Sequence, residues 1–358
     1  MPKNGHLKIK GNLLFVFLLP LFLANCMRST TLTVLQPAQM KLPEHIAKVA
    51  VIDRSKPSNG WLNALEGLFS GEAIGQDRRS RQEAVSGLTD ALTRTPRFQV
   101  VSTGVEMEGS KAGVNLPPAL EWSQIEKICG DYSTDAVAAI ESFDSDNSVS
   151  TRRNDERKKD KNGKYYTVTN YDARQRTSVR IGWRLYDPKT RTIIDEYVTD
   201  DYLERSARGN TERESRDRLP SQVSVTRDVA FNVGLEYGAR IAPIYVSVSR
   251  QYYGKAKGFE AQMEKASRLA QGGDWDAAAD IWKNIAERAG DNRKAAGRAA
   301  CNMAVAAEVK GKLDVALEWA QKAWNDYGNK KARNYINILK QRQNDAARVA
   351  SQMPGKRV

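Results

Sequence analysis

Few residues of this chain have the types that catalysis or metal binding requires. The sequence contains 2 histidines: His6 lies in an amino-terminal leader, and His45 directly precedes an expected strand. A zinc site with paired histidines is therefore excluded from the mature chain, and a Ser-His-Asp triad would have to use His45. A histidine at a strand boundary more often has no catalytic role. We predict no catalytic residue, no metal site and no cofactor.

One segment begins like a calcium-binding loop. From Asp144, the run DSDNS places oxygen ligands at alternate positions. Val149 stands where such a loop needs glycine, however, and Asp155 stands where it needs glutamate. Glycine-rich phosphate-binding motifs are also absent from the sequence. A polar loop is therefore the better interpretation of this segment.

Carboxylates at the ends of expected strands suggest a different chemistry. Asp53, Asp195 and Glu196 end such strands and could meet as paired carboxylates, although acids at strand ends are usually solvated. The resulting alternative hypothesis is a hydrolase or ligand-binding protein. Its site would lie at the carboxyl ends of parallel strands, near Asp53 and the expected loop at 57–77.

Basic residues form the most conspicuous charged segment, within residues 144–164. They include Arg152, Arg153, Arg157, Lys158 and Lys159. Interleaved acidic residues dilute their charge, and the apolar content of the segment is too low for a core, so we expect a solvated loop. A further alternative is a surface that binds an acidic glycan or lipopolysaccharide. Such binding would fall steeply with salt.

The amino-terminal residues predict where the protein is located. An apolar run over residues 13–23 follows lysines and is too short to span a bilayer, which is typical of a signal peptide. Leu23-Ala24-Asn25-Cys26 resembles the lipobox of bacterial lipoproteins, although Asn25 is unusual there. The resemblance implies a signal peptide at 1–25 and lipidation of Cys26. Polar residues, two prolines and the lack of a helical period after Cys26 indicate a tether at 26–43, with an edge strand at 31–35 as an alternative within it.

The resemblance also bears on the location and the partners. In such lipoproteins an aspartate directly after the cysteine favours the inner membrane, and its absence here points to the outer membrane, with the periplasmic face expected. The net charge of +13 would otherwise suggest nucleic acid. Export excludes that partner, so the membrane and another envelope protein are expected instead.

Residues 44–253 have the pattern of an α/β domain with a mixed sheet. Strands near 47–53, 98–101 and 134–143 alternate with helices near 84–92 and 122–129, which indicates parallel crossovers. The later segments predict an antiparallel hairpin, a second charged loop, a helix and a last strand. Those segments are 179–198, 205–218, 225–241 and 244–248.

Residues 255–350 have helical periodicity and an internal repeat. Gly273-Asp274-Trp275 begins a motif that recurs 38 residues later at Gly311. The pair resembles the tetratricopeptide repeat, whose usual period is about 34 residues. The resemblance implies an all-α helical repeat domain with a capping helix near 332–349. We also expect a disordered tail at 351–358. Cys129 and Cys301 lie in helical patterns and are expected to be buried; a disulfide between them is the alternative.

Aromatic residues of the repeats are the candidates for binding a partner. They are Trp275, Trp282, Trp319 and Trp324, together with Asn302 in the position of the repeat's first helix. Two repeats bury little surface by themselves, so we expect them to dock on the α/β domain or on a partner.

The whole arrangement resembles an uncharacterised family of bacterial envelope lipoproteins, chiefly through Gly238–Pro243 and Tyr245–Arg250. The α/β part is also similar, at the level of the fold, to the amino-terminal domain of TolB-like proteins and to lipoproteins related to curli secretion. We therefore expect a non-enzymatic, lipid-anchored scaffold whose repeats bind a helix or an extended peptide of another envelope protein.

Overall fold

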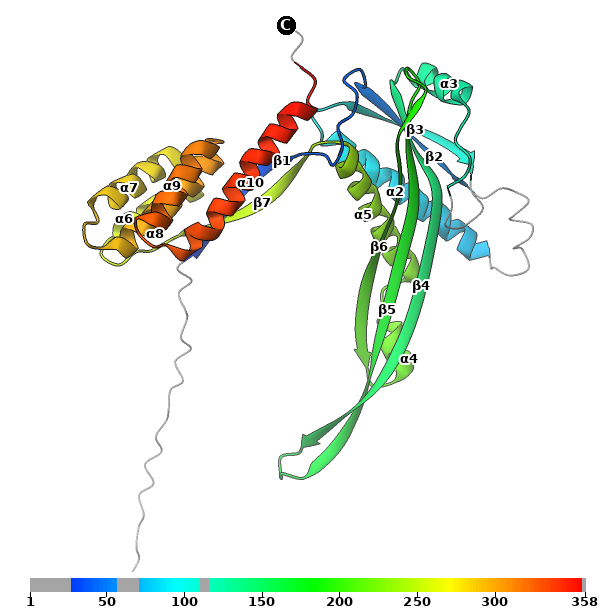
Figure 1. Ribbon diagram of the computed structural model, residues 1–358. Helices are drawn as coiled ribbons and strands as arrows, with labels where there is room; N and C mark the ends of the chain where they lie inside the picture. Colours follow the sequence, from blue (N-terminus) through cyan, green and yellow to red (C-terminus); the bar gives the residue numbers. More distant parts are fainter. Residues whose placement is uncertain (1–26, 57–70, 110–115, 356–358) are drawn as a thin grey trace, which may run out of the picture. The chain divides into compact units, whose positions relative to one another are not determined.

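The computed structural model describes residues 27–56, 71–109 and 116–355, without the side chains of 71–77 (Figure 1). The leader, Cys26 and most of the expected loop at 57–77 therefore lie outside the described residues. Two compact units make up the chain. One contains residues up to Thr31 together with Ser249–Leu339, and the other contains Leu32–Val248 together with the residues from Lys340.

A five-stranded mixed sheet forms the α/β unit, in the order β3-β2-β4-β5-β6. Strand β2 pairs in parallel with β3 and β4, whereas β4, β5 and β6 are antiparallel. The strands are β2 (Lys48–Lys56), β3 (Gln99–Glu108), β4 (Ala136–Lys159), β5 (Tyr165–Asp187) and β6 (Thr192–Gly209). The parallel pairs require crossovers, which α2 (Gly71–Thr93) and α3 (Trp122–Tyr132) provide. The predicted α/β class is confirmed.

One face of this sheet packs on α2 and on α5 (Gln222–Ile241). Trp183 of β5 is fully buried there, and its ring stacks on Tyr237 of α5 with centroids 4.5 Å apart. The other face packs on α3, where Ile125 and Tyr186 are fully buried. Both faces of β2 and of the first half of β4 are therefore covered, which explains the continuous apolar runs at 49–52 and 136–140.

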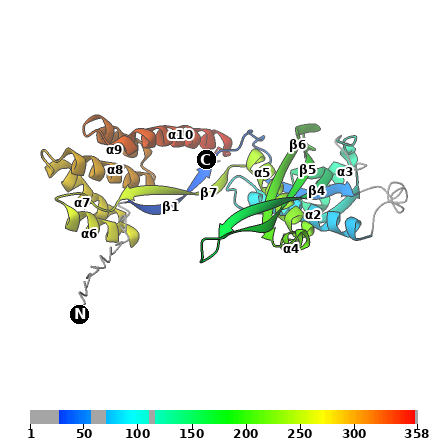
Figure 2. The same ribbon diagram turned by 90° about the horizontal axis from the view of Figure 1, so that it is seen from below.

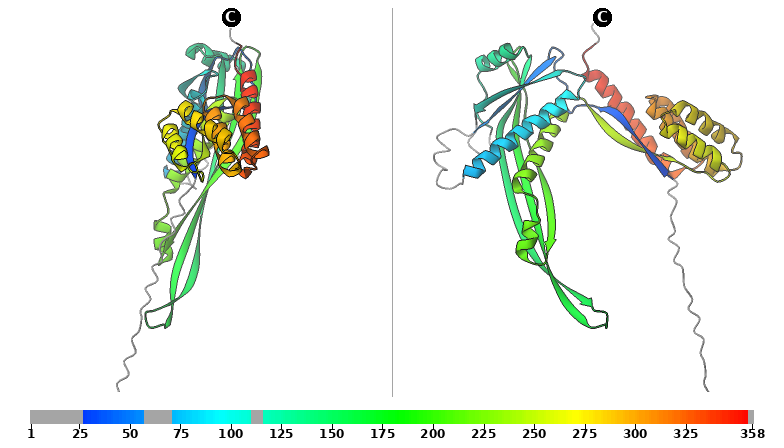
Figure 3. Two further views of the ribbon diagram at one scale, coloured as in Figure 1. Left: turned by 90° about the vertical axis from the view of Figure 1, so that its left-hand side faces the viewer. Right: turned by 180° about the vertical axis from the view of Figure 1, so that it is seen from behind.

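The outer halves of β4, β5 and β6 correct two sequence-based predictions. Loops were expected at 144–164 and 205–218, but β4 continues to Lys159, β6 continues to Gly209, and helix α4 (Glu212–Asp217) follows. Backbone pairing holds β4 and β5 together along the whole hairpin, which extends beyond α5 (Figures 1 and 3). Polar residues can occupy such a strand because much of its surface faces water, so apolar alternation does not reveal it.

Residues 27–36, expected to lie in a tether with an edge strand at 31–35 as the alternative, form strand β1 (Met27–Gln36), which includes that edge strand. This strand pairs with β7 (Ile244–Tyr253) in a two-stranded sheet (Figure 2). Beyond β1, Ala38 and Leu42 are buried, with 0% and 3% of their surfaces exposed. The amino-terminal segment therefore belongs to the folded structure from Met27 onward.

Antiparallel helical hairpins form most of the second unit, as the all-α prediction required. The helices are α6 (Glu260–Gln271), α7 (Trp275–Arg288), α8 (Arg293–Val309), α9 (Leu313–Asn325) and α10 (Lys330–Gln352). Gly273 and Gly311, the two matching glycines of the repeat, both have positive φ, 89° and 73°, and end the turns before α7 and α9.

The end of α10 differs from the expected disordered tail. The helix runs to Gln352, whose side chain bonds to the backbone N–H and carbonyl of Ala38 at 2.9 Å each. Cys129 and Cys301 are both buried as free thiols, as predicted. No helix in the described part of the chain is long and apolar enough to span a membrane.

Candidate functional site

Asn302 lies on the inner side of the helical unit and binds the backbone of β7. Its side-chain oxygen accepts a hydrogen bond from the N–H of Tyr253 at 2.7 Å, and its amide nitrogen donates to the carbonyl of the same residue at 2.8 Å. Both side-chain groups are fully buried. This contact recognises extended backbone regardless of side-chain identity, as strand pairing does.

Two of the candidate tryptophans complete the contact with β7. The ring centroid of Tyr252 lies 5.8 Å from that of Trp275 and 5.8 Å from that of Trp282. Trp282 has no exposed surface and Trp275 has 9%. Together with Asn302 they enclose the chain's own strand, so their surfaces are unavailable to a partner in this structure. Their predicted role in partner binding stays untested.

A buried ion pair holds the same strand further along. Arg250 donates to both carboxylate oxygens of Glu308, at 2.7 and 2.9 Å, and Tyr335 donates to one of them at 2.6 Å. Burial lowers the pKa of Arg250, but the hydrogen bond with Glu308, the charge of that carboxylate and the contact with Tyr335 together outweigh it, and the net shift is upward. Removing one partner of such a pair would leave a buried charge uncompensated.

Trp319 and Trp324 are the candidate residues that keep accessible surface. Both are half-buried against the helical core. Lys322 lies 5.2 Å from the ring centroid of Trp319, and Arg333 lies 5.7 Å from that of Trp324. Val315, one turn before Trp319 on α9, is 40% exposed. Tryptophan and arginine dominate the binding energy of many protein interfaces.

The basic residues of the hairpin are distributed over both faces of β4. Arg153 pairs with Asp155 at 3.1 Å, and Lys158 pairs with Glu156 at 3.4 Å. Arg157 and Lys159 both lie over the ring of Tyr165, 4.3 and 4.7 Å from its centroid. Arg152 differs from these four, because no ion pair or aromatic contact engages it within the described residues.

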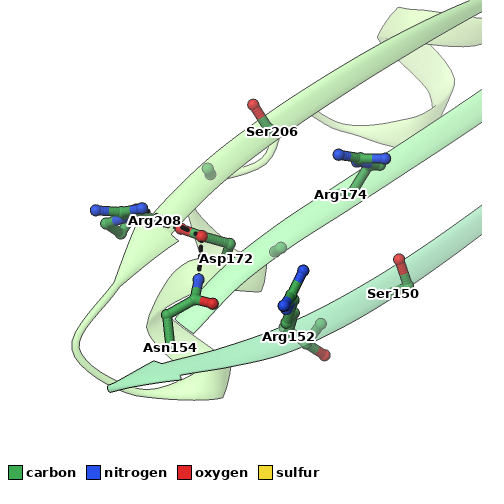
Figure 4. Close-up of a pocket in the computed structure, with 10 residues that line it drawn as sticks. Ser150, Arg152, Asn154, Asp172, Arg174, Ser206 and Arg208 are labelled. Atoms are coloured by element: carbon green, nitrogen blue, oxygen red, sulfur yellow. Dashed lines mark hydrogen bonds and ion pairs between the residues drawn. The ribbon is translucent and has the colours of Figure 1, made fainter. Parts of the chain in front are cut away.

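Arg152 contributes to a hollow of about 700 Å³ on the open face of the three outer strands (Figure 4). We call this site the arginine hollow and define it by Ser150, Arg152, Asp172, Arg174, Ser206 and Arg208. Cross-strand register brings these side chains together, because Asp172 of β5 lies between Arg152 of β4 and Arg208 of β6. The run of basic residues in the sequence could not reveal Arg174 or Arg208, which come from other strands.

Charge is only partly balanced inside the arginine hollow. Arg208 donates to both oxygens of Asp172, at 2.6 and 3.2 Å, and lowers the pKa of that carboxyl group. Asn154 donates a further hydrogen bond to the same carboxylate. Neither Arg152 nor Arg174 forms an ion pair with a described residue. The three arginines and Asp172 sum to a formal charge of +2, and Arg208 also pairs with Glu156 beside the hollow at 3.1 Å, which reduces the excess to +1.

The strand-end carboxylates do not meet as a catalytic pair. Asp53 accepts hydrogen bonds from the N–H and hydroxyl of Ser55, at 2.8 and 2.5 Å, and pairs with Arg81 at 3.3 Å. Asp195 pairs instead with Arg240, and Glu196 pairs with Arg184. Each carboxylate is thus engaged by a different arginine. The hydrolase alternative stays untested, because most of its expected loop at 57–77 lies outside the described residues.

Glu141 is a buried acid that the sequence patterns did not reveal. Arg54 donates to one of its oxygens at 2.7 Å and Tyr186 to the other at 2.5 Å. Burial raises the pKa of Glu141, while the hydrogen bond from Tyr186 and the charges of the nearby arginines lower it by less. Arg54 also donates to the carbonyl of Pro118. We interpret this network as the support that fixes the segment before α3 on the sheet.

His45 lies 3.0 Å from the buried carboxylate of Asp187. The same carboxylate accepts hydrogen bonds from the N–H of Lys189 and from the backbone and hydroxyl of Thr190. Asp187 therefore stabilises the β5–β6 turn, and His45 adds one more contact to it. Within the described residues no three acidic, histidine or cysteine side chains form a group that could hold a metal ion.

Comparison with known proteins places the α/β unit in a family. Residues 46–253, more than half of the chain, match a family model described as a domain of unknown function, DUF8603. The chain belongs to this family. Residues 264–341 match a second model, also a domain of unknown function, DUF6340. Both matches agree with the division into an α/β part and a helical part.

No curated protein matches the chain. A solved structure, the crystal structure of TolB from Acinetobacter baumannii, is 12% identical, with a TM-score of 0.20. The match covers 59% of this chain and 31% of that chain, so it spans about a third of the other protein. A similarity this low carries no argument about function.

Proposed function

We propose that the protein is a non-enzymatic, lipid-anchored interaction protein of the bacterial envelope, with the helical unit as its docking module. The observation that carries this proposal is the pair of hydrogen bonds between Asn302 and the backbone of Tyr253. These hydrogen bonds support a helical module that binds a polypeptide segment in extended conformation. The two matching turns at Gly273 and Gly311 support the resemblance to tetratricopeptide repeats.

The partner surface of this module is proposed on α9, because the inner side is filled by β7. Val315, Trp319 and Lys322 recur at spacings of four and three residues and therefore share one helical face. An apolar side chain, an aromatic ring and a cation side by side suit a segment with both apolar and acidic residues. Such a segment of another envelope protein is the proposed partner.

Site-specific photo-crosslinking in cells tests this surface. A photoreactive phenylalanine derivative at position 319 of the full chain should give one specific adduct with an envelope protein. The same residue at position 264, an exposed site on α6, should give none. Additional replacement of Val315 by Asp should abolish the adduct at position 319, since it puts a charge on the apolar face. Equal adducts at both positions, or none at 319, would contradict the proposal.

Substitutions at two different tryptophans distinguish a loss of partner binding from a loss of folding. Trp282→Ala removes a fully buried ring and should destabilise the helical unit by about 3–5 kcal/mol. Trp319→Ala should leave most of the stability and lower partner binding. A partner that is lost with Trp282→Ala alone would therefore report unfolding rather than an interface on α9.

A further inference from the structure

The arginine hollow has a layered arrangement that the strand register explains. Ser150 of β4 and Ser206 of β6 flank Arg174 of β5, and the next row outward consists of Arg152, Asp172 and Arg208. These alternate residues all lie on the face opposite α4, and Figure 4 shows them around one hollow. Arg152 and Arg174 are diagonal neighbours on adjacent strands, a spacing that long side chains can bridge.

Two cations in this position repel each other unless an anion joins them. The one carboxylate of the hollow, Asp172, is already bound by Arg208 through two parallel hydrogen bonds. Asn154 donates to the same carboxylate, so one arginine and one amide engage both oxygens of Asp172. Arg152, Arg174 and the two serine hydroxyls together offer more donors than one further carboxylate can accept. A tetrahedral oxyanion has three or four acceptor oxygens and can therefore accept hydrogen bonds from all of these donors.

The other residues that line the hollow indicate which class of molecule carries the oxyanion. The hollow is open and polar, and alanine is the only apolar residue type along its lining, so it offers no pocket for an acyl chain. Its volume of about 700 Å³ lies in the range of small-molecule sites. Hydroxyl-rich ligands match such a lining, because serine and asparagine can both donate to and accept from sugar hydroxyls.

We propose that the arginine hollow binds the phosphate groups of an acidic glycan, with Arg152 and Arg174 as the phosphate ligands. Packing on the opposite face keeps the site in place, because Ala173 and Gln175, the neighbours of Arg174, have 0% and 1% exposed surface. Thr151, next to Arg152, donates to Glu212 of α4 at 2.8 Å. This site is independent of the proposed partner surface on α9.

Calorimetric titration of the protein from Met27 onward tests the proposal with three probes. The first is a phosphorylated lipopolysaccharide core oligosaccharide, the second is the same oligosaccharide after enzymatic dephosphorylation, and the third is inorganic phosphate. We expect the first to bind, the second to bind at least tenfold more weakly, and the third to compete with the first. Equal binding of the first two probes would overturn the proposal, and so would absence of binding by the first.

Three single substitutions test whether binding depends on Arg152 and Arg174 specifically or on the overall positive charge of the hairpin. Arg152→Gln and Arg174→Gln should each weaken binding of the phosphorylated oligosaccharide about tenfold, as expected for the loss of charge-assisted hydrogen bonds. Arg153→Gln removes the same charge from a residue paired with Asp155 and should have no such effect. Equal losses in all three variants would overturn the assignment. Unchanged thermal unfolding of each variant shows that the hairpin remains folded.

Discussion

Glu141 shows how a single buried residue makes stability depend on pH. It has no exposed surface, and burial raises its pKa above the ordinary value for glutamate. The unfolded chain therefore releases this proton at lower pH than the folded chain. Between the ordinary and the raised pKa the folded state binds more protons, so the contribution of Glu141 to stability falls as the pH rises through this window.

Urea unfolding at about pH 4 to 7 measures this contribution, because the window starts near the ordinary glutamate pKa of about 4.3. The free energy of unfolding of the wild type, minus that of Glu141→Gln, should decrease as the pH rises. Glu318→Gln, at an exposed position on α9, should leave the pH dependence unchanged. A difference that increases with pH would mean that the folded carboxyl group has a lowered pKa instead.

At the scale of elements, α2 and α5 pack closely because glycine lies at their contact. A Cβ atom added at Gly234 of α5 would lie 2.1 Å from the carbonyl oxygen of Ala84 and 2.8 Å from the backbone nitrogen of Leu88. Gly87 of α2 has the reciprocal contact, 2.0 Å from the carbonyl oxygen of Phe231. Backbone atoms cannot give way as a flexible side chain can, so the helices would have to separate.

Gly234→Ala should therefore lower the free energy of unfolding by about 3 kcal/mol or more, the cost of overpacking a core contact. Gly130→Ala is the matched control in α3, since an added Cβ meets no atom within 4 Å. It should stabilise the protein by about 0.5–1 kcal/mol through helix propensity. Denaturant unfolding of both variants measures the two effects, and a neutral Gly234→Ala would show that the helices can shift apart cheaply.

Elements with one clearly apolar face were predictable from the sequence, and others were not. Periodicity located α5 and the inner half of β5, and a continuous apolar run located β2, because each of these elements buries its apolar side chains. The outer half of the β4–β5 hairpin escaped prediction because backbone pairing between its two polar strands holds it, and such strands show no apolar alternation. The arginine hollow escaped for the same reason, since Arg152 and Arg174 become neighbours only through the register. Similarly, no local pattern links Asn302 to Tyr253.

At the scale of the whole molecule, the proposed function depends on Cys26, which precedes the described residues. Radiolabelled palmitate should be incorporated into the wild-type chain and not into Cys26→Ser, since acylation at the lipobox-like segment requires the Cys26 thiol. Cys129→Ser and Cys301→Ser should keep the label, because both thiols are buried in the folded protein. Label that persists in Cys26→Ser would refute a lipid anchor at this residue.

The early start of β1 has a mechanical consequence for such an anchor. Strand β1 begins at Met27, so an acylated Cys26 would leave a single peptide bond between the lipid and the first paired strand. The folded protein would then be attached to the bilayer without a flexible linker. Any pull on the lipid would load the hydrogen bonds between β1 and β7 directly instead of stretching a coil.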